Sequence, residues 1–401
     1  MIRLTAIVLA LIGALLLLMI GIYLGGHPSD LPKAVQNAAG IESDDAVVDE
    51  GLSQIKSSFY RPVNQDKLAN DSLKGAVAGL RDRFSTYFTP QQYKRFQEVT
   101  GGSYAGVGMD VTASKRGLLV QNVYPGTPAK KAGIKPGDQI TEINGKSIAG
   151  KNLNAATALI RGKPGTQVKL TVLSDGKSRE VEVSRAKVEV PVVDSKIQTV
   201  ALPSGKNVKV AEIALRTFTS GASKQLSAAV ASAQRSGAQA MVLDLRNNGG
   251  GLLNEAVLVS SIFVEDGTIV TTKSRSQGTK VYPATGKAIA PNLPIAVLVN
   301  GGTASAAEIV TAALHDLRKA PVVGGSTFGK GVFQEISRLS NGGALDLTVG
   351  EYFTPNGANL GGGGSKQGKG IKPDVAAKDS PKTRLDEALQ RARERAAQAT
   401  G

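Results

Sequence analysis

A serine and a lysine stand in two glycine-rich segments of the C-terminal third of the chain. Ser305 lies in the run Gly-Gly-Thr-Ala-Ser-Ala-Ala-Glu of residues 301–308, and Lys330 follows 25 residues later between two glycines. A lysine next to a serine can replace histidine as the general base, provided that its amine is neutral. The chain contains only two histidines, so a histidine base is hardly available. The pair predicts acyl transfer with Ser305 as nucleophile.

Ser305 also fits a structural role. Ser305 and Glu308 match S-x-x-E, the capping box that begins many helices. The two roles share one geometry, because a serine at a strand-to-helix turn exposes its hydroxyl near a helix N-terminus that favours negative charge. The motif alone leaves both roles open.

Lys330 is surrounded by small and apolar residues, Thr327-Phe328-Gly329 before it and Gly331-Val332-Phe333 after it. Such surroundings favour partial burial, which disfavours the ammonium form and lowers the pKa of the amine. The alternative is an ordinary solvated lysine. Residues 324–330 also spell G-x-x-x-x-G-K, but Gly331 stands where a phosphate-binding loop needs serine or threonine, and a strand-like segment follows instead of a helix.

A third glycine-rich segment follows an apolar, buried-type strand at residues 240–245. It reads Asp-Leu-Arg-Asn-Asn-Gly-Gly-Gly-Leu from residue 244 to 252 and opens a predicted helix. Glycine amides at such a turn can point at an oxyanion. A plain tight turn is the alternative reading.

The elements that must hold these segments form a predicted α/β region at residues 189–375. Apolar strands at 209–215, 240–245 and 295–299 alternate with helices at 223–236, 252–263 and 304–317, which favours a largely parallel sheet. Residues 101–188 instead show short alternating strands and a helix at 153–160, typical of a small, mostly β module. Residues 45–100 have a helical pattern, and residues 376–401 contain a charged amphipathic helix at 383–398.

The N-terminus is apolar from Leu4 to Leu24, after Arg3. Twenty-one helical residues at ~1.5 Å each can cross a ~30 Å hydrocarbon core. Residues 25–28 make a poor cleavage site, so we expect residues 1–24 to be an uncleaved signal anchor and 25–44 a linker; removal of a signal peptide is the alternative. Arg3 on the cytoplasmic side places the remaining chain outside the cytoplasm, in the periplasm or cell envelope.

The composition excludes several chemistries. Cysteine is absent, which excludes disulfides, thiolate metal sites and a cysteine nucleophile. No histidine–carboxylate cluster is arranged for a metal, and we expect neither a metal nor another cofactor. The net charge of +15 suits solubility and anionic membrane surfaces; we expect no nucleic-acid partner, because no nucleic-acid-binding motif accompanies the charge.

The motifs together are specific, and the chain resembles the carboxy-terminal processing peptidases, or tail-specific proteases. The resemblance spans about residues 45–375 and rests on matches in order and spacing: the runs 83–90, 133–138, 159–162, 244–251, 303–308, 329–331 and 370–374. It implies a multidomain chain in which a PDZ-like module is embedded beside a crotonase-like α/β (ββα-type) serine protease core.

The resemblance also implies roles for single residues. Ser305 would be the nucleophile, Lys330 the base, and Gln334 the acceptor that orients the lysine amine. The oxyanion donors would be the amides of Ala306 and Gly250; the family usually has proline where Gly249 stands here.

The PDZ-like module is expected to capture apolar protein C-termini. By resemblance, the loop that binds the terminal carboxylate and the pocket for the apolar tail comprise Ala105, Gly106, Val107, Gly108, Met109 and Leu159. Arg161 would link the position of the PDZ module to the catalytic site. Unfolded or tail-tagged proteins are the expected substrates, and a homodimer and an accessory activator are further expected partners.

Two other functions remain to be weighed. A membrane-anchored PDZ scaffold without catalysis explains residues 101–188 but not the serine, lysine and glutamine together. A histidine-dependent serine protease with PDZ domains places PDZ after the catalytic part, and His315 is ten residues past Ser305 on the same predicted helix. The sequence order argues against it.

Overall fold

The computed structural model describes residues 44–378 and 386–400, with isolated positions 13, 17, 21 and 35 before them. Apart from these isolated positions and residue 44, the predicted membrane segment and linker therefore lie outside the described residues. Among the helices of the described part, none is long and apolar enough to cross a membrane. Residues 1–76 and 77–401 form two compact units, and each is described by itself.

The first unit contains helix α3 (Asp44–Ser58) and most of α4 (Gln65–Gly79). Pro62 lies between the two helices, where a residue without a backbone N–H interrupts the helical pattern. Val48, Ile55 and Phe59, which share the predicted apolar side of the first helix, are about half exposed or more.

A six-stranded sheet forms the centre of the second unit, and the strands predicted from the apolar runs all belong to it. Its order is β10-β11-β12-β15-β16-β19, with β10 antiparallel to β11 and every other pair parallel. The bounds are β10 (Val193–Ala201), β11 (Asn207–Leu215), β12 (Ala240–Asp244), β15 (Ile295–Val299), β16 (Val322–Gly324) and β19 (Val375–Ala376). The predicted parallel core is confirmed.

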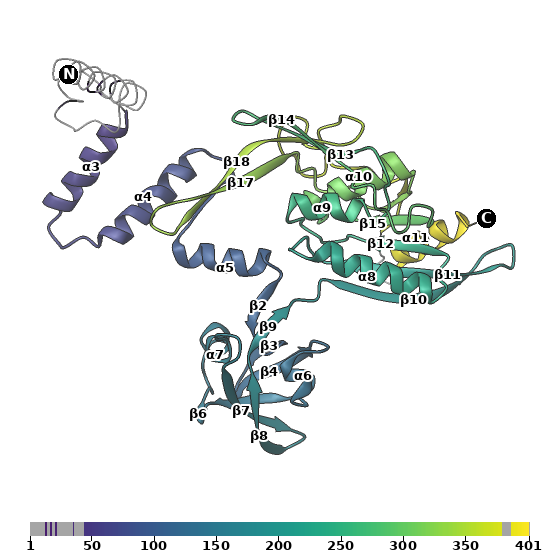
Figure 1. Cartoon of the computed structure of the whole chain (residues 1–401), viewed down its shortest axis with the longest axis horizontal. Coiled ribbons are helices and arrows are strands. Elements are labelled where there is room, and N and C mark those ends of the chain that lie inside the picture. Colours follow the sequence, from purple (N-terminus) through teal and green to yellow (C-terminus); the bar gives the residue numbers. More distant parts are fainter. Residues whose placement is uncertain are drawn as a thin grey trace, which may run out of the picture. The chain divides into compact units, whose positions relative to one another are not determined.

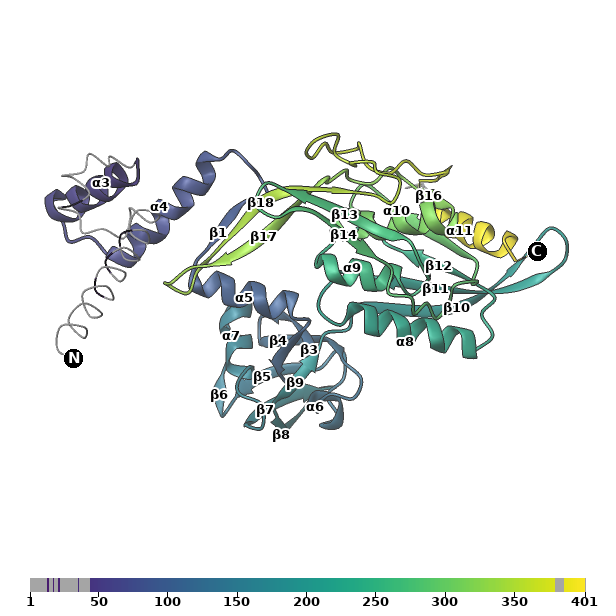
Figure 2. The ribbon, with the colours of Figure 1, turned by 45° about the horizontal axis from the view of Figure 1, so that its top comes forward.

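Helices cover both faces of this sheet. Three helices pack against one face in a single apolar core: α8 (Ala222–Arg235), α9 (Leu253–Ser260) and α10 (Ala306–Arg318). Helix α11 (Glu387–Gln398) covers the other face, where its Ala388, Leu389, Ala392, Ala396 and Ala397 meet the outward valines and leucines of the strands. Figure 1 shows α11 beside β12 and β15, and Figure 2 shows α11 and α8 on opposite sides of β11 and β12. The C-terminal helix is thus part of the core.

A second sheet contains β17, the strand-like segment expected after Lys330, whereas its other strands were not predicted. It runs β1-β18-β13-β14, with β17 also paired to β18, and every pair is antiparallel. The bounds are β1 (Thr86–Phe88), β13 (Thr268–Ser274), β14 (Gly278–Pro283), β17 (Val332–Arg338) and β18 (Ala344–Phe353). Strand β1 corrects the expectation that residues 45–100 are helical throughout, because Thr86–Phe88 pairs with residues 344–346. Helix α5 (Pro90–Thr100) then begins at a proline in its first turn.

The mostly β module also has the predicted class. Its sheet is β3-β4-β5-β7-β8, with β6 paired to β5, and a two-stranded ladder of β2 and β9 leads into and out of it. The bounds are β2 (Ser103–Gly106), β3 (Met109–Ser114), β4 (Gly117–Val123), α6 (Pro128–Lys131), β5 (Gln139–Ile143), β6 (Lys146–Ser147), α7 (Leu153–Ile160), β7 (Gln167–Ser174), β8 (Lys177–Ser184) and β9 (Ala186–Glu189). The module buries an apolar core of its own.

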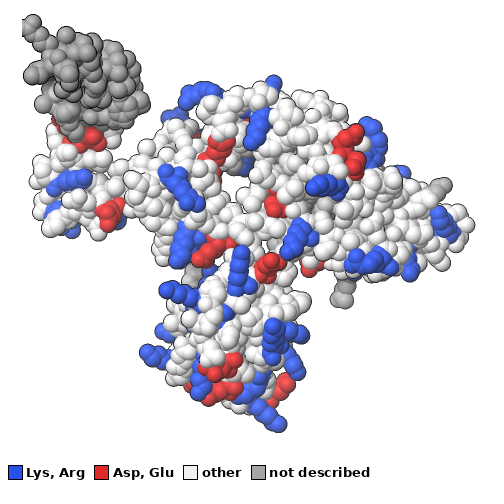
Figure 3. Space-filling view, in the orientation of Figure 1, with Lys and Arg blue, Asp and Glu red and all other residues white. Residues whose placement is uncertain are grey.

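The basic side chains do not gather in one place on the face seen in Figure 3. Lysine and arginine are dispersed there, and acidic side chains lie among them. A dispersed positive charge suits solubility better than a dedicated binding stripe for a polyanion.

Candidate active site

Ser305 occupies a strained turn between β15 and α10. Its φ is 57° and its ψ is −120°, and it is the N-cap of α10. A left-handed φ is unusual for a residue other than glycine and costs about 1–3 kcal/mol, which the surrounding structure must offset. The same strand-to-helix geometry presents the serine hydroxyl of a nucleophile elbow. The N–H of Ser305 donates to the Glu308 carboxylate (2.9 Å), so the predicted pairing of these two residues is present.

Two buried hydrogen bonds hold the turn of Ser305 against the neighbouring glycine-rich segment. The Thr303 hydroxyl donates to the Leu245 carbonyl (2.8 Å), and the Ala304 N–H donates to the Asn248 carbonyl (3.0 Å). The segments 244–252 and 301–308 follow adjacent parallel strands, β12 and β15. Because the carboxyl ends of parallel strands meet at one edge of the sheet, the topology brings both glycine-rich segments together.

Lys330 is half-buried directly before β17. Its Nζ donates to Gln334 Oε1 (2.6 Å) and lies 4.6 Å from the centroid of the Phe84 ring. Burial lowers the pKa of the amine, whereas the nearby carboxylates of Asp346, Asp82 and Glu308 raise it and the Arg83 guanidinium lowers it further. Lys330 therefore lies in an environment that favours the neutral form over that of a solvated lysine.

A chain of hydrogen bonds connects Gln334 of β17 to the residues that precede β1. Its Nε2 donates to Thr348 Oγ1 (2.9 Å), the Thr348 N–H donates to Ser85 Oγ (3.0 Å), and the Ser85 hydroxyl donates to Asp82 Oδ2 (2.6 Å). The lysine amine is thus tied to the segment that contains β1. Sequence reasoning missed Phe84, Thr348 and Asp346; the run 83–90 was part of the resemblance, but nothing in it indicated contact with Lys330.

The backbones of Ser305 and Lys330 lie close together. One oxygen of Glu308, Oε2, accepts hydrogen bonds from the N–H of Ser305 (2.9 Å) and from the N–H of Lys330 (3.0 Å). Among the hydrogen bonds of residues 44–378 and 386–400, none joins Ser305 Oγ to Lys330 Nζ. In this conformation the amine is directed to Gln334 and Phe84 instead.

The predicted oxyanion donors lie beside the serine. A Cβ on Gly250, whose φ is 101°, would stand 2.8 Å from Ser305 Cβ and 3.0 Å from the Ala306 nitrogen, so only glycine fits there. Ala306 is the first residue of α10, and its N–H has no acceptor within the helix. The Gly250 N–H, however, donates to Asn248 Oδ1 (2.9 Å). The structure places both residues as expected but engages one of the two amides with a buried asparagine.

A groove of about 370 Å³ runs along α7 and β3 of the mostly β module. Gly106, Val107 and Met109 line it as predicted, and so do Leu153, Asn154, Thr157, Ile160 and Arg161 of the helix. Ala105, Gly108 and Leu159, which were also predicted, do not line it. Leu159 is 43% exposed, because residues 153, 157 and 160 share one face of α7 and residue 159 lies off that face. Gly108 (φ 89°) allows the loop to pass the Thr127 side chain, which a Cβ would strike.

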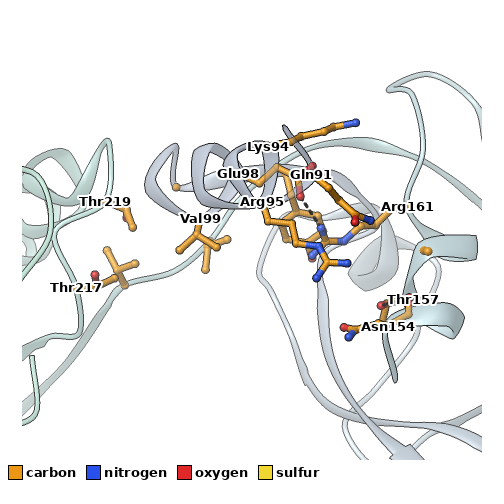
Figure 4. Close-up of a pocket in the computed structure, with 15 residues that line it drawn as sticks. Gln91, Lys94, Arg95, Glu98, Val99, Asn154, Thr157, Arg161, Thr217 and Thr219 are labelled. Atoms are coloured by element: carbon orange, nitrogen blue, oxygen red, sulfur yellow. Dashed lines mark hydrogen bonds and ion pairs between the residues drawn. The ribbon is translucent and has the colours of Figure 1, made fainter. Parts of the chain in front are cut away.

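A larger cavity of about 590 Å³ adjoins this groove (Figure 4). It lies between α5 and α7 and extends to Thr217 and Thr219. Thr217 Oγ1 donates to the Gly250 carbonyl (3.2 Å), so the far end of the cavity borders the glycine-rich segment 244–252. Arg161 lies where the groove and the cavity meet; it donates to Glu98 Oε2 of α5 (2.8 Å), and its guanidinium is 5.1 Å from the Tyr104 ring centroid.

His315 has a different environment. It stands in the last turn of α10, where its two ring nitrogens contact Asp316 (3.1 Å) and Asp374 (3.4 Å). Ser305 stands before the first turn of that helix, so His315 is not its partner. In the part of the chain that the structure describes, no group of three or more His, Asp or Glu is placed to hold a metal ion.

Comparisons with known proteins agree with this arrangement. Residues 209–377 match Peptidase family S41, and residues 105–184 match the PDZ domain. The carboxy-terminal processing protease CtpA of Bacillus subtilis is 35% identical over 370 residues, which cover 92% of this chain and 76% of that protein. A probable CtpA-like serine protease of Staphylococcus aureus is 38% identical over 82% of this chain and 63% of its own length.

A solved structure gives the same result. The photosystem II D1 C-terminal processing protease matches with a TM-score of 0.50 and 30% identity, over 84% of this chain and 88% of that one. The resemblance inferred from the sequence motifs is confirmed. The chain belongs to the carboxy-terminal processing proteases of peptidase family S41, and it is a serine-type peptidase with a PDZ domain inserted before its catalytic core.

Proposed function

We propose that this chain is an endopeptidase that binds protein C-termini in its PDZ groove and cleaves by a Ser305–Lys330 dyad. The observation that carries the proposal is the environment of Lys330. Its amine is half-buried, and its backbone N–H donates to the same oxygen of Glu308 as the backbone N–H of the strained Ser305. A neutral amine near an exposed serine hydroxyl is the minimum that this chemistry requires.

The proposed reaction passes through an acyl-enzyme. Neutral Lys330 takes the Ser305 proton as Oγ attacks the peptide carbonyl, and the oxyanion rests on the N–H groups of Ala306 and Gly250. The lysine ammonium then returns the proton to the leaving amine. Water attacks the acyl-enzyme with Lys330 again as base and frees Ser305. Gln334 holds the amine in place by accepting a hydrogen bond from it.

Two contacts describe a resting conformation that must change before the reaction. Lys330 Nζ stacks on Phe84, which favours the ammonium form, and the Gly250 N–H is engaged by Asn248. Rotation of the lysine side chain toward Ser305 and release of Gly250 from Asn248 would complete the site. We propose that substrate binding brings about both changes.

Arg161 is suited to connect these events to the PDZ module. It contacts Glu98 of α5. Helix α5 is preceded in the chain by β1 and by residues 82–85, and Phe84 in that segment contacts the Lys330 amine. A tail that enters the groove meets Arg161 at the groove's end. We propose that tail binding breaks the Arg161–Glu98 pair and allows the PDZ module to move.

The location and assembly also belong to this proposal. The apolar residues 4–24 support a membrane anchor with the catalytic part in the periplasm or cell envelope, or secretion if the segment is removed. Unfolded or tail-tagged proteins with apolar C-termini are the proposed substrates. A homodimer and an accessory activator are further proposed partners.

The deciding experiment compares cleavage of two versions of one unfolded protein. The first ends in apolar residues with a free carboxylate, and the second ends in charged residues with an amidated C-terminus. We expect the wild-type chain to cleave the first faster and Ser305→Ala to cleave neither. If Ser305→Ala were fully active, the nucleophile would be wrong. If the wild-type chain bound the tail but cleaved nothing under any condition, the non-catalytic scaffold would be the better function.

A further inference from the structure

Glu308 is a buried carboxylate whose contacts go beyond the capping of a helix. Its side chain is fully buried and accepts four hydrogen bonds. Oε2 accepts from the N–H of Ser305 (2.9 Å) and of Lys330 (3.0 Å). Oε1 accepts from the N–H of Gly329 (2.7 Å) and from the Thr327 hydroxyl (2.6 Å).

These contacts favour an ionised side chain. All four partners present donors, and the Thr327 oxygen already accepts the N–H of Ile371 (2.7 Å). A protonated carboxyl would have to direct its own hydrogen at one of these donors. Burial raises the pKa of Glu308 above its usual value, and the hydrogen bonds from Thr327, Lys330, Gly329 and Ser305 offset only part of that effect. Charge-assisted bonds of this kind are about twice as strong as neutral ones.

The position of the carboxylate gives it a role in the reaction. Capping of α10 needs only the contact with Ser305, which is three residues away, whereas Thr327, Gly329 and Lys330 are 19 to 22 residues away. The two glycines nearest to it leave no room for side chains: a Cβ on Gly370 would stand 2.5 Å from Oε1, and one on Gly329 would strike the 366–370 backbone. The surrounding loops are built around this one group.

We propose that Glu308 is a positioning residue that sets the distance between the nucleophile and the base by binding both of their backbone amides. The proposal rests on the Ser305–Lys330 dyad proposed above. The negative charge of Glu308 also raises the pKa of Lys330. Glu308 therefore fixes the geometry of the pair and helps to set the pH at which Lys330 becomes a base.

Three substitutions separate these effects. Glu308→Gln keeps the shape but turns one oxygen into an NH₂ group, so that at least one of the three backbone N–H groups then faces a donor. Glu308→Asp keeps the charge but is one methylene too short to reach both segments. Glu255→Gln is the matched control: Glu255 is also a buried helix glutamate, and it accepts the N–H groups of Gly221 (2.9 Å) and Ser223 (2.8 Å) away from the dyad.

The measurement is the rate at which a fluorophosphonate labels Ser305 in the full chain, from acid to alkaline pH, with thermal unfolding of each variant. The groups around the Lys330 amine are Asp346, Asp82, Glu308 and Arg83, and Glu308 itself faces Tyr352. Of these groups around the amine, only Glu308 changes its charge in this series. Removal of its charge should lower the pKa of Lys330, because an anion beside an amine favours the ammonium form.

In the plot of labelling rate against pH, we expect Glu308→Gln to lower the plateau at alkaline pH at least tenfold. We also expect it to move the rising limb, where Lys330 loses its proton, to lower pH. Glu308→Asp should lower the plateau similarly with an unmoved limb, and Glu255→Gln should lose thermal stability with wild-type labelling of the folded protein. A Glu308→Gln protein with the wild-type plateau and limb would overturn the inference. If Glu308→Gln did not fold, a wild-type plateau in Glu308→Asp would overturn it equally. Undiminished labelling of Ser305→Ala would instead refute the dyad itself.

Discussion

Replacement of Phe84 by leucine should turn Lys330 into a base at lower pH. The ring centroid lies 4.6 Å from Lys330 Nζ, inside the range in which an aromatic face attracts a cation. Such an attraction is worth about 0.5 kcal/mol at exposed sites and about 2 kcal/mol when desolvated, so we take about 1 kcal/mol for a half-buried pair. Leucine keeps the apolar surroundings and removes the ring's attraction for the ammonium.

The expected size follows from that energy. Because about 1.4 kcal/mol corresponds to a factor of ten, about 1 kcal/mol multiplies the neutral fraction of the amine about fivefold on the acid side of its titration. In the proposed dyad the neutral amine is the active form, so activity should rise with pH through the pKa of Lys330, and loss of the ring should move that rise toward acid. The change should appear as about fivefold faster labelling of Ser305 below the midpoint, with little change above it.

The assay is fluorophosphonate labelling against pH, which avoids titration of a peptide substrate. Phe353→Leu is the matched control, because Lys273 Nζ also lies 4.6 Å from the Phe353 ring and the proposed reaction does not use Lys273. Arg83, which also stacks on Phe84 (4.7 Å), keeps its contacts with Ser365 and with the Phe328 ring. An unmoved limb in Phe84→Leu, or one displaced toward alkaline pH, would refute this account of the lysine's environment.

Three further predictions test other parts of the site. Lys330→Ala and Lys330→Arg should both lose turnover while circular dichroism and thermal unfolding stay close to wild type; near-normal cleavage by the arginine variant would contradict a neutral base. Gly250→Ala should abolish cleavage and destabilise the fold by about 1–3 kcal/mol, measured by urea unfolding, because the new Cβ would meet Ser305 at a left-handed φ. Arg161→Ala should change stability by less than about 1 kcal/mol, since its pair with Glu98 is largely exposed, but should weaken the rate advantage of substrates with a free apolar tail. An unchanged tail preference would count against its role as a link.

The sequence by itself determined the parts of the molecule that depend on neighbours along the chain. The apolar runs at 240–245 and 295–299 became parallel strands, the Ser305–Glu308 spacing became the start of a helix, and the small apolar residues around Lys330 indicated its partial burial. Periodicity, capping and turn chemistry act over a few residues, so they can be read without a structure.

Only the tertiary structure decided which distant groups meet. Phe84 reaches Lys330 across 246 positions because β1 pairs with β18, and no local pattern in a three-residue strand announces that pairing. Ile160 rather than Leu159 lines the groove of the PDZ module, because the packing of α7 against the core of that module decides which face of the helix meets the groove. Asn248 bonds to Gly250, and Glu308 joins the backbones of Ser305 and Lys330, because the parallel strands β12 and β15 end, and helix α10 begins, at the same edge of the sheet. Contacts of this kind depend on how whole elements pack, which side-chain types and their spacing do not specify.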